Sequence, residues 1–107
     1  MGLFGFGKNK ISNKKISNTV FERFQSVGPP KEIDTASYKE RYIKMLNDLD
    51  SWATENNFTD MNRSAISGEI ENILRTTYRN TGYDDVVQDY INLCRRIILP
   101  LHKDWNF

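Results

Sequence analysis

Apolar residues recur at spacings of three and four in four separate segments, and this spacing places side chains on one face of an α-helix. The first segment begins at Ile16, after a stretch that lacks the pattern. Thr19 and Glu22 have the spacing of a capping box, and Gly28-Pro29-Pro30 ends the segment. A short helix is therefore predicted, and its apolar stripe consists of Ile16, Val20, Phe21, Phe24 and Val27.

The second segment follows the two prolines. Ser37 and Glu40 form another capping box, although Asp34 could start the helix one turn earlier. The helix is expected to end near Asn56 and Asn57. Its apolar residues fall on one narrow face: Tyr38, Tyr42, Met45, Leu49 and Trp52.

The third segment is predicted to start at Thr59 or Asp60 and to run to about Asn80, before the stop signal Thr81-Gly82. Its expected seam consists of Ile66, Ile70, Ile73 and Thr77, with Leu74 and Tyr78 alongside.

The fourth segment takes its cap and a favourable negative charge from Asp84-Asp85, and Pro100 ends it. Its apolar residues form two adjoining faces, one of Val87, Tyr90, Ile91, Cys94 and Ile98, and one of Val86, Leu93 and Ile97. This arc is wider than one neighbouring helix normally covers.

No segment alternates with the period of a strand, so the sequence predicts an all-α fold. We expect a small helical bundle of three long antiparallel helices, closed by the short N-terminal helix over the second face of the last one. Residues 16–107 form this single domain, and residues 1–15 form a flexible basic arm. The aromatic tail, residues 101–107, is expected to fold back onto the bundle.

Composition and charge agree with one soluble globular domain, because the 107 residues are 38% hydrophobic and 27% charged. The formal net charge is +1, from 15 basic and 14 acidic residues. Residues 1–27 carry five basic residues and one acidic residue, a charge of +4, whereas residues 28–107 carry 10 basic and 13 acidic residues, a charge of −3. The charge asymmetry therefore lies in the basic N-terminal arm.

The residues that usually carry chemistry are scarce. Cys94 is the only cysteine and lies on an apolar stripe, so we expect a core residue and a reducing compartment. His102 is the only histidine and follows Pro100. Neighbouring carboxylates such as Glu69 and Glu71 do not face each other on a helix. We therefore expect no enzyme, no cofactor, no metal site and no small-molecule substrate.

The basic arm is the first candidate binding feature. Aromatic and lysine side chains there could lie on an anionic membrane surface, or on phosphates of nucleic acid, which we consider the weaker alternative. Acylation of Gly2 is not expected, because Phe6 occupies the position at which myristoylation requires Ser or Thr. The candidate contact residues are Phe4, Phe6, Lys8, Lys10, Lys14 and Lys15.

The second candidate binding feature is a set of apolar or small residues on helix surfaces that are not expected to pack into the core. Gly68 with Ser64 makes a low strip on which another backbone could lie close. The candidate partner surface consists of Ile43, Met61, Ser64, Gly68, Val86, Leu93 and Ile97.

These observations favour a non-enzymatic protein–protein interaction module of the inhibitor, immunity, adaptor or phage-regulator type, binding another protein or a second copy of itself. The alternative is a peripheral membrane protein held by its N-terminal arm. The chain has no signal-peptide pattern and no apolar stretch of about 20 residues, so a cytoplasmic location is expected.

Overall fold

The computed structural model describes residues 11–100, which form four α-helices and two short 3₁₀ helices without any strand. The all-α prediction is therefore confirmed. Along the chain the elements are α1 (Asn13–Phe24), η2 (Gln25–Val27), η3 (Pro30–Glu32), α2 (Ala36–Glu55), α3 (Asp60–Thr77) and α4 (Asp84–Ile98). Within residues 11–100, no helix has the length and the apolar character needed to cross a lipid bilayer.

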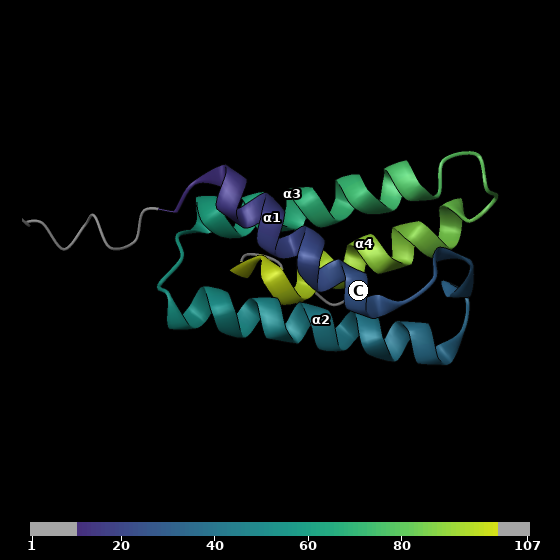
Figure 1. Cartoon of the computed structure of the whole chain (residues 1–107), viewed down its shortest axis with the longest axis horizontal. Helices are drawn as coiled ribbons and strands as arrows, with labels where there is room; N and C mark the ends of the chain where they lie inside the picture. The colour runs from purple at the N-terminus through teal and green to yellow at the C-terminus, as the bar shows by residue number, and fades with distance from the viewer. Residues whose placement is uncertain (1–10, 101–107) are drawn as a thin grey trace, which may run out of the picture.

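The three long helices alternate in direction along the horizontal axis of the view, and α1 packs across them (Figure 1). Both α1 and α4 contact α2 and α3, and α1 lies in front of that pair whereas α4 lies behind it (Figure 1). The expectation that the short helix covers the second face of the last helix is therefore wrong. Specific contacts hold α1 against α3 and α2. The Ser17 hydroxyl donates to the Glu69 carboxylate at 2.7 Å, and the Phe24 ring packs edge-on against the Tyr42 ring with 6.1 Å between the ring centroids.

Three of the four α-helices, α1, α2 and α3, start one residue after a Ser or Thr whose hydroxyl caps the helix. Ser12 accepts from the backbone N–H of Lys15, so α1 begins at Asn13 and includes part of the predicted arm. Thr35, and not Ser37 or Asp34, caps α2. A hydroxyl cap satisfies backbone N–H groups before the first buried residue is reached, which is why helices start earlier than the apolar pattern indicates.

The remaining boundaries are close to the predicted ones. Thr59 caps α3 in a capping box with Asn62. The end of α3 is Thr77, three residues before the predicted end at Asn80. Asp84 and Asp85 lie in the first turn of α4, where their charge is favourable, but neither side chain caps the helix.

The core lies between the four helices and contains most of the predicted apolar stripe residues. The largest completely buried side chains are Tyr38, Tyr42, Ile16, Ile33, Leu46, Leu49, Ile66, Ile70, Leu74, Ile91, Ile98 and Val20. Cys94 is also fully buried, as expected. The seam of α3 is rotated from the predicted one, because Thr77 is exposed, Ile73 is half-buried, and Arg63 and Ser67 are buried in their place.

One end of the bundle is joined by Arg63, which is only 8% exposed. Its guanidinium donates to the carboxylate of Asp50 at 2.7 Å, to the hydroxyl of Thr54 at 3.0 Å, and to the backbone oxygen of Ile98 at 2.9 Å. A single side chain thus connects α2, α3 and the C-terminal end of α4. The bond to Ile98 also satisfies a carbonyl that the end of the helix leaves without an intrahelical partner.

Candidate functional site

The partner-surface residues predicted on α2 and α4 do not form an open apolar patch. Val86, Leu93 and Ile97 are half-buried and pack against the core, and Ile43 is half-buried as well.

The residues predicted on α3 lie on its outer face. Met61 is 80% exposed, and Ser64 and Gly68 are also exposed. A Cβ atom added at Gly68 would meet no atom within 4 Å, so no part of residues 11–100 approaches it closely. The predicted partner surface therefore consists of two groups: half-buried residues on α2 and α4, and exposed residues on α3.

The predicted anionic-surface residues are only partly within the described range. Lys14 and Lys15 lie in the first turn of α1 and are exposed. Phe4, Phe6, Lys8 and Lys10, together with His102 and the tail of residues 101–107, lie outside the described residues.

An apolar hollow that the sequence did not predict lies between α1 and the C-terminal half of α3. We call it the α1–α3 groove, and its volume is about 200 Å³. Phe21 stands at this groove and is 59% exposed, although the sequence placed it on the buried stripe. The groove is lined by Phe21, Phe24, Gln25, Gly28, Pro30, Tyr38, Ile73, Thr77 and Tyr78.

The reason for the exposure of Phe21 is helix geometry. Ile16, Val20 and Phe24 point into the space between α2 and α3. At 100° per residue, Phe21 lies about 100° from the centre of that stripe. The 12-residue helix α1 buries only the side of the helix that carries Ile16 and Val20. Phe21 therefore lies at the edge of the buried side.

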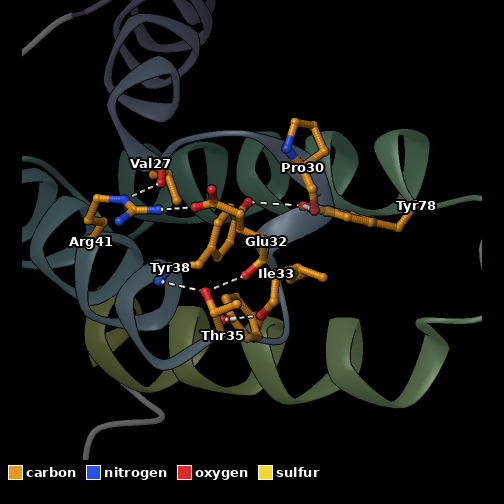
Figure 2. Close-up of polar contacts among 9 residues, drawn as sticks. Val27, Pro30, Glu32, Ile33, Thr35, Tyr38, Arg41 and Tyr78 are labelled. Atoms are coloured by element: carbon orange, nitrogen blue, oxygen red, sulfur yellow. Dashed lines mark hydrogen bonds and ion pairs between the residues drawn. The ribbon is translucent and has the colours of Figure 1, made fainter.

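Gln25, Gly28 and Pro30 form one end of the groove, and we call the segment from Gln25 to Thr35 the strap. Figure 2 shows the Arg41 guanidinium reaching both the Val27 carbonyl oxygen, at 2.6 Å, and the Glu32 carboxylate, at 2.7 Å. Gly28 has a φ of 114°, and a Cβ atom there would lie 2.8 Å from the Arg41 guanidinium. The backbone conformation therefore favours glycine at this position, and a Cβ atom would in addition displace the Arg41 guanidinium.

Tyrosine hydroxyls hold the strap from the other side. Tyr78 donates to the Pro30 carbonyl oxygen at 2.8 Å (Figure 2), and Tyr90 donates to that of Ile33 at 2.7 Å. Because Tyr78 has only one hydroxyl hydrogen, Tyr38 supplies the hydrogen of the 3.1 Å bond between Tyr38 and Tyr78. Burial raises the pKa of both Tyr38 and Tyr78, so these hydroxyls remain neutral donors at physiological pH.

A second hollow of about 690 Å³ lies at the turn between α3 and α4. Arg75 and Arg79 line it from the end of α3, and Asp84 and Asp85 line it from the start of α4. All four side chains are exposed to solvent, and the rest of the lining includes the apolar residues Leu74 and Val87.

The side chains with potential reactivity are engaged in structure. Burial raises the pKa of the Cys94 thiol to about 12, and the thiol contacts the Ser67 hydroxyl at 3.6 Å. Burial acts to raise the pKa of Glu71, but hydrogen bonds from Arg95 at 2.9 Å lower it overall. The part of the chain from 11 to 100 contains no group of three or more residues able to hold a metal ion.

The sequence interpretation did not predict the α1–α3 groove, whose lining residues Phe21 and Ile73 come from different helices. The signal for Phe21 was its offset from the Ile16–Val20 stripe, but nothing local places it beside Ile73, 52 residues later. Comparisons with protein-family models, curated proteins and solved structures find no match.

Proposed function

We propose that this protein is a non-enzymatic module that binds another protein through the α1–α3 groove. The observation that carries the proposal is Phe21, a large aromatic side chain left 59% exposed beside a hollow with apolar walls. Aromatic side chains that project next to a hollow are typical anchors of protein interfaces.

The size of the groove favours a side chain of a partner over a free small molecule. Its volume of about 200 Å³ is below the roughly 300–1,000 Å³ of small-molecule sites. The nearby residues Gln25 and Thr77 are polar but uncharged, and interface centres are depleted in charged residues.

The strap supports this function because it fixes the shape of the groove before a partner arrives. Gly28 and Pro30 line the groove, and Arg41 and Tyr78 hold the strap that contains them. A site whose walls are already ordered does not lose further conformational entropy on binding.

Site-specific photo-crosslinking in the native cell tests the proposal. A photoreactive amino acid at Gln25, which lines the groove, should give a discrete adduct with another protein, and the same label at Asn56 should not. The additional substitution Phe21→Ser should abolish the Gln25 adduct. An adduct that survives Phe21→Ser, or equal adducts from Gln25 and Asn56, would show that the groove is not the binding surface.

A second candidate function is contact with an anionic membrane surface. Lys14 and Phe21 are seven residues apart on α1 and therefore share an exposed face, which combines a positive charge with an aromatic ring. Co-sedimentation with anionic vesicles, lost on Lys14→Glu and absent with neutral vesicles, is the expected result for this function. We place the protein in the cytoplasm in either case, because its one cysteine suits a reducing compartment.

A further inference from the structure

We propose that residues 101–107, which we call the 101–107 segment, bind in a groove between α2 and α4, with the Trp105 ring as the main contact. Two hollows of about 260 and 240 Å³ lie along these helices. Lys39 from α2 and Asp89 from α4 line both hollows, so the two adjoin, and together we call them the α2–α4 groove. The inference does not rest on the proposed function, because it concerns a different groove.

The α2–α4 groove has an apolar wall that is only half-buried. Val86 lines one hollow and Leu93 lines the other, and both belong to the second apolar face of α4. The helix α1 lies on the other side of the α2–α3 pair from α4 (Figure 1). A segment from outside residues 11–100 can therefore bury the part of this face that is still exposed.

The 101–107 segment starts next to the groove and is long enough to follow it. The helix α4 ends at Ile98, and the groove begins at Arg96, within the last turn. From Arg96 back to Val86 the helix rises about 15 Å, at 1.5 Å per residue. Seven residues span up to about 23–25 Å. A chain that turns back after Pro100 can therefore reach every part of the groove.

The charges of the groove are complementary to those of the segment. Lys39 and Arg96 carry positive charge, Asp89 carries negative charge, and all three side chains are exposed. None of the three forms an ion pair with another of residues 11–100. The segment contains Lys103 and Asp104. Each charge of the segment thus finds the opposite charge in the groove, which favours this register over random contacts.

Trp105 suits a groove with one apolar wall and a charged rim. A tryptophan ring buries about 150–250 Å² of surface, and its indole N–H requires a hydrogen-bond acceptor when the ring is covered. Val86 and Leu93 offer apolar contact, and the carboxylate of Asp89 offers the acceptor. Each hollow is smaller than the roughly 300–1,000 Å³ of small-molecule sites, so a side chain fits better than a free ligand.

A weak contact is sufficient, because the segment and the groove belong to one chain. A tethered segment has an effective concentration in the millimolar range, so a contact with a Kd of about 1 mM is occupied in about half of the molecules or more. The consequence is that Val86 and Leu93 are covered by the chain itself, and that a partner must displace the segment to reach them.

Paramagnetic relaxation in the full chain tests the inference. Cys94 is fully buried and burial raises the pKa of its thiol to about 12, so a nitroxide reagent labels only the cysteine introduced by Asn106→Cys. The label should broaden the amide signals of Asp89 and Leu93 and leave that of Thr77, in the α1–α3 groove, sharp.

Variants of the labelled chain identify the contact. Trp105→Ser should abolish the broadening at Asp89 and Leu93, whereas Phe107→Ser, the matched control, should retain most of it. Labelled protein without ¹⁵N, mixed with unlabelled ¹⁵N protein, should cause no broadening, because the contact is made within one chain. Broadening that is strongest at Thr77, that survives Trp105→Ser, or that also occurs in the mixed sample would each overturn the inference.

Discussion

Two arginines hold the two ends of the bundle, each through one carboxylate and one backbone carbonyl oxygen, and Arg63 also bonds to the Thr54 hydroxyl. At one end Arg63 donates to the Ile98 carbonyl oxygen and to the Asp50 carboxylate. At the other end Arg41 donates to the Val27 carbonyl oxygen and to the Glu32 carboxylate. The side chains of the first ion pair are 9% and 28% exposed, and those of the second pair are 38% and 41% exposed.

The difference in burial between the two ion pairs predicts a difference in what each arginine contributes to stability. An exposed ion pair is screened by water and contributes about 0–1 kcal/mol. Breaking a buried pair leaves a desolvated partner behind and costs much more. The strap end, where Arg41 lies, instead depends on neutral tyrosine hydroxyls, which can be buried without the cost of burying a charge.

The largest expected effect is therefore that of Arg63→Met. We expect a loss of about 2–3 kcal/mol in the free energy of unfolding, because the substitution removes hydrogen bonds to Asp50, Thr54 and the Ile98 carbonyl oxygen. Arg41→Met, the matched control, should cost about 1 kcal/mol. Urea unfolding of both variants measures the difference, and equal losses would contradict the role assigned to burial.

Alkaline pH should lower the stability of the protein through its buried thiol and tyrosine hydroxyls, and neither arginine takes part in this loss. Burial raises the pKa of Cys94 and of Tyr90 to about 12, and it also raises those of Tyr42 and Tyr78. Between the unfolded and the folded pKa values only the unfolded chain loses these protons, so stability is full below about pH 9 and falls above it.

The expected loss at pH 10.5 is on the order of 2 kcal/mol from Cys94 alone, at about 1.4 kcal/mol for each pH unit. Urea midpoints between pH 7 and pH 11 measure it. Arg63→Met should show the same decline from its lower starting point, because arginine stays charged in this range. A wild-type stability that is level up to pH 11 would refute the assignment of these groups as buried and neutral in the folded state.

Substitution of glycine should have opposite effects in the strap and in α3. Gly28→Ala is expected to cost about 2 kcal/mol, because its backbone conformation is unfavourable for any other residue. Gly68→Ala, in the middle of an exposed helix face, should increase stability by up to about 1 kcal/mol. Thermal unfolding compares the two, and a stabilising Gly28→Ala would show that the strap is not held as described.

The sequence predicted what depends on local periodicity. The four helices follow from apolar residues at spacings of three and four, and the burial of Cys94 follows from its place on the stripe of Val87 and Ile91. The boundaries were predicted less well, because Ser12 and Thr35 cap helices ahead of the first buried residue.

The candidate site and the two ends depend on contacts between distant residues, which periodicity does not encode. Arg41 reaches back 14 residues to Val27, and Tyr78 reaches back 48 residues to Pro30. Arg63 did give a signal, because it lies one turn before Ser67 on the same buried face of α3. A charged residue on a buried stripe indicates a paired charge and can be used in this way in other sequences.

The smallest expected effect is that of Tyr78→Phe, and it tests whether the strap end depends on a hydroxyl or only on packing. The substitution keeps the ring and its edge-on contact with the Tyr83 ring, in which the ring centroids are 6.0 Å apart. It removes the hydroxyl that donates to the Pro30 carbonyl oxygen and accepts from the Tyr38 hydroxyl. A loss of about 1–1.5 kcal/mol is expected from urea unfolding, since the buried Tyr38 hydroxyl then lacks this bond.

Tyr83→Phe is the matched control, and it should change stability little, because the Tyr83 hydroxyl makes no hydrogen bond to any of residues 11–100. Since Pro30 lines the groove, Tyr78→Phe should also reduce the yield of the Gln25 adduct while the helices remain folded. If the adduct and the stability are both unchanged, packing alone holds the strap, and the contrast between a charged end and a neutral hydrogen-bonded end must be given up.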